Sequence, residues 1–204
     1  MATTWDTIIP LLSPDLPGCP DATLKTALAA VAADFCARTH IWRETLDRQY
    51  TIPNIAEYDI EGDAVIEAPL WVVCNDHTLT HTDARLVNKE DMSSKGEPSM
   101  FWVVNDRAIR LFFIPDKKMT LDVTVALKPS RSATGVEDWI YETWADALVS
   151  GAIWRLAKVP GKLWSSPEMA TAHRLMYEQA VTNARIRDYR TVPLQVSLRP
   201  AARR

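Results

Sequence analysis

The feature that most constrains the fold is a double change in the spacing of apolar residues along the 204-residue chain. After Asp21, which we predict as a helix N-cap, apolar residues recur at the spacing of one buried helix face: Leu24, Leu28, Val31, Phe35 and Trp42. The middle of the chain, roughly residues 46–129, instead holds short segments rich in Val, Ile, Thr and aromatic residues, with turn residues between them. Helical spacing then returns. This order predicts an α+β fold in which a sheet is inserted between helices.

The C-terminal part of the chain predicts two helices joined by a short turn. The first covers residues 136–159 and has one apolar face: Val136, Ile140, Trp144, Ala147, Leu148 and Gly151. The second begins after Ser166, a residue type favoured at N-caps, with Pro167 at its first helical position. Between the helices, Pro160 and Gly161 are suited to end the first helix and reverse the chain.

These elements predict three parts. Residues 1–45 and 130–187 form a discontinuous helical bundle, and residues 46–129 form an antiparallel β unit that projects from it. The sequence FWVVNDRAIRLFF is the clearest hairpin in that unit. Residues 188–204 have alternating apolar residues and several arginines, which predicts an extended basic arm: Arg190, Val192, Leu194, Val196, Leu198, Arg199, Arg203 and Arg204.

Charge is divided unevenly between the body and the arm. Residues 185–204 carry six arginines and one aspartate, a charge of +5, whereas residues 1–184 carry 17 basic and 25 acidic residues, a charge of −8. A basic segment on an acidic body indicates an acidic protein surface or nucleic acid phosphate as its partner. The alternation of apolar residues favours a segment that adds to a neighbour's sheet edge or lies in its groove, and a frayed terminus is the alternative.

Catalytic and metal-binding motifs are weak in this sequence. The Gly161-Lys162 pair lacks the second glycine of a phosphate-binding loop and follows a helix instead of a strand. The stretch CNDHTLTHTD contains four residues with ligand atoms but no repeated ligand pair: Cys74, His77, His81 and Asp83. A hydrolase would depend on His77 or His81, and no nucleophile motif accompanies them. We therefore expect no enzyme, no metal site and no cofactor.

The most unusual feature of the composition is its eight tryptophans. Half of them lie in the predicted helical hairpin: Trp139, Trp144, Trp154 and Trp164. They fit either a thick aromatic core or a contact surface for another protein, because tryptophan is enriched at the centres of interfaces. The sequence leaves both interpretations open. No apolar run approaches the roughly 18–20 residues that cross a bilayer, so we expect no membrane partner.

Over residues 5–187 the sequence resembles bacteriophage head-to-tail adaptor proteins, also called head completion or connector proteins. The resemblance is carried by PGCPD…AADFCARTHIW, GAIWRLAKVPGKLWSSP and the following A…YEQAV…AR. It implies a virion structural protein, made in the host bacterial cytoplasm, that forms a ring of usually twelve copies under the portal. Such a ring links the capsid to the tail or nozzle protein and extends the channel through which DNA passes without specific binding.

Carried onto this chain, the resemblance implies that residues 188–204 reach the portal. The acidic body suits a DNA channel independently, because negative walls do not grip phosphate. The alternative function, suggested by the arm alone, is a nucleic-acid-binding module. Against it, residues 1–184 carry an excess of acidic residues.

Overall fold

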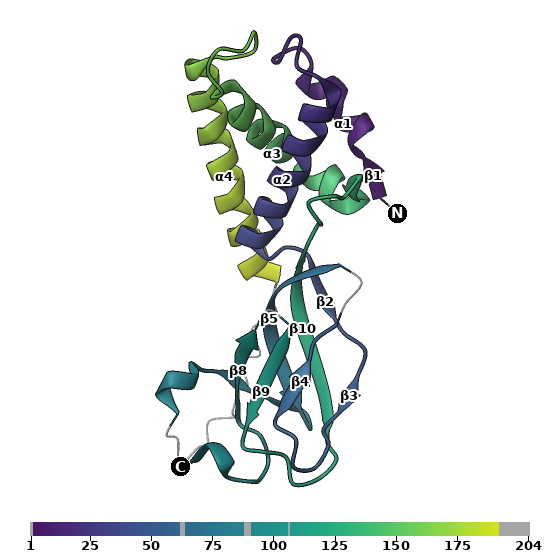
Figure 1. Ribbon diagram of the computed structural model, residues 1–204, viewed down its shortest axis with the longest axis vertical. Helices are drawn as coiled ribbons and strands as arrows, with labels where there is room; N and C mark the ends of the chain where they lie inside the picture. Colours follow the sequence, from purple (N-terminus) through teal and green to yellow (C-terminus); the bar gives the residue numbers. More distant parts are fainter. Residues whose placement is uncertain (1, 62–63, 88–90, 106, 192–204) are drawn as a thin grey trace, which may run out of the picture.

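The computed structural model describes residues 2–61, 64–87, 91–105 and 107–191. Figure 1 shows an elongated molecule with the helices at one end and most of the strands at the other. Each end has its own hydrophobic core, one among the helices and one between the sheets. The α+β class and the insertion of the strands between helices are confirmed.

Helices from both ends of the chain form the bundle: α1 (Trp5–Leu12), α2 (Asp21–Thr39), α3 (Asp138–Ala157) and α4 (Pro167–Thr191). Beside them, β1 (Ala2–Thr4) pairs antiparallel with β11 (Gly135–Glu137). Helix α1, which contains Pro10, was not predicted from the sequence. Its buried residues nevertheless have the spacing of one helix face, which is the signal that identifies it: Trp5, Ile8, Ile9 and Leu12.

Several predicted helix boundaries are wrong. Asp21 is the first residue of α2 and not its N-cap, which is Pro20. The helix ends at Thr39 because His40 adopts a left-handed conformation (φ 51°), so Trp42 lies beyond it. The predicted helix from residue 136 starts two residues later, because Val136 pairs with Thr3 in the β1–β11 sheet.

The C-terminal arm also begins later than predicted. Residues 188–191 belong to the last turn of α4 and are helical, not extended. The helical hydrogen-bond pattern therefore continues past the expected start of the arm. Of the predicted arm residues, only the backbone of Arg190 is described, and the others lie outside the described residues: Val192, Leu194, Val196, Leu198, Arg199, Arg203 and Arg204.

The bundle closes around Gly151 of α3. A Cβ atom at this position would lie 2.5 Å from Cγ1 of Val31 in α2 and 2.9 Å from Cδ2 of Tyr177 in α4. The missing side chain therefore lets three helices approach one another. Near this point, Phe35 packs on the rings of Trp144 and Tyr177, with centroids 5.4 and 6.2 Å apart.

The β unit consists of two sheets. The first has the order β2–β10–β5–β6, with β3 also paired to β10, and the second has the order β4–β9–β8–β7. The strands are β2 (Arg43–Thr45), β3 (Gln49–Tyr50), β4 (Glu57–Asp59), β5 (Val65–Cys74), β6 (His77–Thr78), β7 (Thr80–His81), β8 (Met100–Asn105), β9 (Ala108–Phe112) and β10 (Thr120–Lys128). The predicted FWVVNDRAIRLFF hairpin is confirmed as the antiparallel β8–β9 pair. The pairing of β7 with β8 is parallel, which departs from the predicted all-antiparallel unit and is permitted by the long crossover between them.

The bundle and the β unit meet at a narrow waist (Figure 1). Trp42, just past the end of α2, packs against both hydrophobic cores, and its carbonyl accepts a hydrogen bond of 2.8 Å from the N–H of Leu127 in β10. Strand β10 therefore starts among the sheets and ends against the bundle. Because one side chain contributes to both cores, the waist is a packed junction.

Candidate functional site

The connection between α3 and α4 is a helix joint. The N–H of Ser166 donates to the carbonyl of Ala157 at 2.9 Å, which ties the start of α4 to the end of α3. Gly161, after the exposed Pro160, has φ +73°, the left-handed conformation that favours glycine. Ser166 caps α4, since its Oγ accepts a hydrogen bond of 3.3 Å from the N–H of Met169, and Pro167 is the first helical residue.

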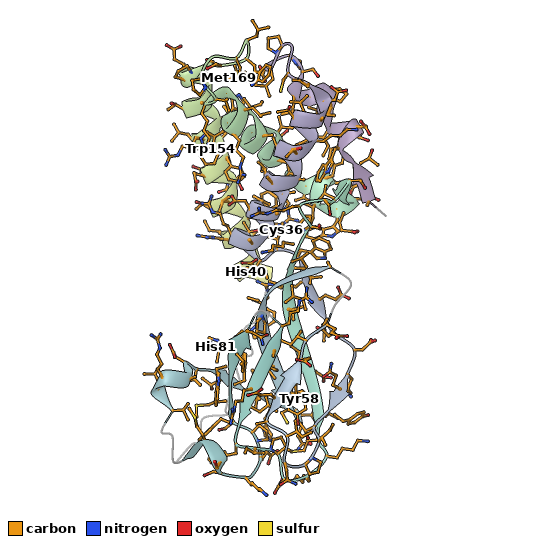
Figure 2. All side chains as sticks on the ribbon, in the orientation of Figure 1. Cys36, His40, Tyr58, His81, Trp154 and Met169 are labelled. Carbon is orange, nitrogen blue, oxygen red and sulfur yellow. The ribbon has the colours of Figure 1, made fainter. Side chains whose placement is uncertain are left out.

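Three of the four tryptophans in the hairpin pack against the bundle core: Trp144, Trp154 and Trp164. Trp154 lies on the α4 side of the bundle (Figure 2), with its ring centroid 5.8 Å from that of Tyr177 and cations from Lys158 and Arg174 nearby. Trp139, in the first turn of α3, is different because 42% of its surface is exposed. Of the four, it is the one with an exposed side chain, whereas the other three are partly buried.

A polar cluster on the bundle surface joins α2, α3 and α4. The Asp34 carboxylate accepts a hydrogen bond of 2.7 Å from the Tyr177 hydroxyl, and the guanidinium of Arg155 lies 3.8 Å from it. The Arg38 guanidinium donates to both carboxylate oxygens of Glu178, one at 3.0 Å. The i, i+4 spacing of Asp34 and Arg38 is the only local signal of this cluster, because its other members are far apart in the chain.

The chemistry of this cluster is that of a structural clamp. Burial, and then the hydrogen bond to Asp34, raise the pKa of Tyr177 well above its usual range. The hydrogen bond from Arg38 holds the pKa of Glu178 below its ordinary value. Both shifts move the pKa values of Tyr177 and Glu178 further from neutral pH. A general acid or base works best with a pKa near the operating pH. The cluster therefore keeps fixed charges that hold the helices together.

The candidate metal ligands do not converge. Cys74 is buried, and burial raises the pKa of its thiol to about 11. His77 and His81 lie on different strands of different sheets, and the His81 ring packs on Phe101 with centroids 5.2 Å apart. Asp83 is paired with Arg85 at 2.6 Å. Within the described residues, no group of three or more His, Cys, Asp or Glu side chains could hold a metal ion.

A groove of about 850 Å³ lies at the waist, where β1 and β11 face the ends of β5 and β10. Its described lining mixes apolar and charged side chains, including Trp42, Ile60 and Glu137. Lys128 in the lining forms an ion pair with Glu67 at 2.5 Å. The described lining residues include neither histidine nor cysteine.

The exposed apolar residues of the bundle gather on its outer surface. On α4, the exposed fractions are 68% for Leu175, 57% for Met176 and 46% for Ile186. Leu163 and Val159 are exposed at the α3–α4 joint. Exposed aliphatic side chains that cluster on one helix are typical of surfaces that contact another protein. None of the described helices is long and apolar enough to cross a membrane.

Comparison with known proteins identifies the family of the chain. The sequence model of the family described as SU10 adaptor protein matches residues 3–200, which includes the bundle and the β unit. A comparison with curated proteins finds no match.

Proposed function

We propose that this chain, which belongs to the family of phage head-to-tail adaptor proteins, forms a ring. As a member of that family, it is a virion component that contacts other head and tail proteins. The ring, of about twelve copies in our proposal, docks on the portal, links the capsid to the tail or nozzle protein and extends the DNA channel. The observation that carries the proposal is the family match over residues 3–200, nearly the whole chain.

The described surfaces support a structural role. The exposed side chains singled out above are aliphatic residues and Trp139, which are suited to protein contacts. The Asp34–Tyr177 and Arg38–Glu178 hydrogen bonds hold α2 and α4 together. We propose that the protein acts through these contacts, without catalysis, metal or cofactor.

The predicted arm, residues 188–204, is the proposed portal contact; its first four residues are the last turn of α4. Helix α4 carries the chain from the α3–α4 joint back to the waist (Figure 1), where the described residues end at Thr191. The apolar residues of the arm would pair with the portal, and its arginines would meet acidic side chains there. The acidic residues of the body would leave the DNA free to slide, since they do not bind phosphate.

The basic arm also favours a second candidate function, a nucleic-acid-binding module. Two full-length variants separate the candidates. One replaces Val192, Leu194, Val196 and Leu198 with serine and keeps the arginines. The other replaces Arg190, Arg199, Arg203 and Arg204 with glutamine and keeps the apolar residues.

Each variant is mixed with its cognate portal ring, and binding is measured by co-sedimentation and negative-stain imaging, with DNA affinity measured in parallel. We expect the serine variant to lose portal docking and to keep the DNA affinity of the wild type. Loss of DNA retention in the glutamine variant, with portal docking intact in both variants, would support the nucleic-acid-binding module instead.

A further inference from the structure

Two strands of the β unit have an edge that is paired along only part of its length, within the part of the chain that the structure describes. Strand β5 pairs with β10 on one edge, but on its other edge β6 pairs only with Val73 and Cys74. Strand β8 pairs with β9 on one edge, and on the other edge β7 pairs only with Met100 and Phe101. The remaining stretches, which we name the open edges, are residues 65–71 of β5 and 102–105 of β8.

The open edges lie on either side of one short segment and extend in the same direction. Residues 77–81 contribute β6 to the first sheet and β7 to the second, so this segment bridges β5 and β8. Because β6 runs antiparallel to β5 and β7 runs parallel to β8, both open edges continue from the segment towards the waist. Ile66 and Arg107, close to the waist ends of these edges, both line the waist groove.

The hydrophobic core between the sheets is incompletely covered beside the open edges. Residues directly opposite each other in an antiparallel pair point to the same face of the sheet. Val103 lies opposite Ile109, which is fully buried, yet 39% of Val103 is exposed. Ile66 lies opposite the fully buried Leu127 but is only partly buried. A further strand with one apolar face would cover these side chains and pair the backbone groups of the open edges.

The C-terminal residues of the same chain have the pattern of such a strand. Residues 192–204 lie outside the described residues, and their sequence contains four alternating apolar residues: Val192, Leu194, Val196 and Leu198. In a strand, alternate residues share one face. Pro193 is near the start of this stretch, where strands tolerate a missing N–H. Residues 192–198 and 65–71 are equal in number, so an extended 192–198 is long enough to follow the open edge of β5.

Helix α4 brings the chain to the waist ends of the open edges. The Arg185 guanidinium donates a hydrogen bond of 2.8 Å to the Arg38 carbonyl in the last turn of α2, and α4 continues to Thr191. In Figure 1, α4 descends on the side of the molecule that also carries β5 and β8, whereas β2 and β3 lie on the other side. A tethered segment has a high effective concentration at a site within its reach, which favours the chain's own residues over those of another copy.

We propose that residues 192–198 of the free chain add a strand to the open edges of their own β unit. The strand runs parallel to β5 and antiparallel to β8, and its four apolar residues face the core between the sheets. It also prevents the open edges from pairing with another molecule. The same apolar residues are the proposed portal contact, so they leave the open edges when the chain docks. This release rests on the proposed function, whereas the docking in the free chain does not.

Intramolecular cross-linking with a short bismaleimide tests the docking in the full-length chain. In a Cys19→Ser background, Gln195→Cys is combined with Ala68→Cys in the open edge of β5. The matched control combines Gln195→Cys with Thr45→Cys in β2, at the opposite edge of the same sheet. Thr45 is a suitable control because it pairs with Thr124, the β10 residue that also lies opposite Trp71 in the open edge. The remaining cysteines are buried and stay as they are: Cys36 and Cys74.

Without portal and at low protein concentration, we expect the A68C–Q195C pair to form the intramolecular cross-link about tenfold faster than the T45C–Q195C pair. The rates are followed by mass spectrometry and normalised to the reactivity of each single cysteine. Equal rates, or a covalent dimer as the main product, would overturn the inference. Portal docking of the same variants reports on the proposed function separately, because it does not depend on the cross-link.

Two further measurements test the apolar contact and its release. Replacing the four apolar residues of the arm with serine should slow the A68C–Q195C reaction about tenfold, whereas replacing its arginines with glutamine should leave the rate unchanged. A serine variant that reacts as fast as its parent would contradict the apolar contact. An excess of cognate portal rings should also slow the reaction about tenfold, because the arm is then held by the portal. An unchanged rate in chains that have docked would contradict the release.

Discussion

Gly151→Ala tests whether the three-helix contact at Gly151 holds the bundle together. The added Cβ would lie 2.5 Å from Cγ1 of Val31 and 2.9 Å from the Tyr177 ring. Carbon atoms in good contact are about 3.5–4.0 Å apart, so the helices must separate by roughly 1 Å. Val31 is β-branched and fully buried, and it has little freedom to rotate away.

The sign of the change in the free energy of unfolding distinguishes overpacking at Gly151 from the effect of helix propensity. Overpacking of a buried site costs about 1–3 kcal/mol, and this site lies at the upper end because the nearest atom belongs to a stiff side chain. Replacing glycine with alanine inside a helix returns about 1 kcal/mol. We therefore expect a net loss of about 2 kcal/mol in the free energy of unfolding, which lowers the melting temperature by about 4–8 °C in a chain of this length.

Urea unfolding followed by circular dichroism measures the change. Ala172→Gly, on the exposed side of α4, is the control that isolates the propensity contribution. The double variant Gly151→Ala with Val31→Ala should be more stable than the sum of the two single effects predicts, by about 0.5–3 kcal/mol, because the smaller residue makes room for the added methyl group. A Gly151→Ala variant as stable as the wild type, or more stable, would refute the close three-helix contact.

Three further predictions concern the α3–α4 joint and the clamp. Gly161→Val should lower the free energy of unfolding by about 1–2 kcal/mol in chemical denaturation, because φ is +73° although nothing crowds the position, and Gly161→Asn should cost less. Ser166→Ala should cost about 1 kcal/mol in the same assay, because the N–H of Met169 loses its cap. The pKa of Glu178 is lowered by its hydrogen bond from Arg38, so the contact stabilises fully above pH 4.5 and is lost as the pH falls through the lowered folded value. In the Glu178→Gln variant, the melting temperature should therefore fall less steeply as the pH drops below 4.5. A pH profile identical to that of the wild type would contradict a stabilising Arg38–Glu178 contact.

The sequence by itself determined the elements whose cause is local. The Leu24–Phe35 stripe, the β8–β9 hairpin and the Ser166-Pro167 helix start each follow from side-chain spacing or from the backbone preferences of a few adjacent residues. The Trp5, Ile8, Ile9 and Leu12 pattern was equally local, and Pro10 obscured it. The family resemblance was also present in the sequence, because its motifs are continuous stretches of chain.

Only the tertiary structure decided the features that depend on residues far apart in the chain. The first turn of the predicted helix at residue 136 became a strand because β1, more than a hundred residues earlier, pairs with it. In the sequence, Gly151 is one residue of an apolar helix face, and only the structure shows that α2 and α4 both pack closely against it. Likewise, the hairpin tryptophans look equivalent in sequence, and only packing partly buries Trp144, Trp154 and Trp164 while leaving Trp139 exposed. Periodicity indicates which face of a helix is apolar, whereas the neighbours that cover that face are fixed by long-range contacts.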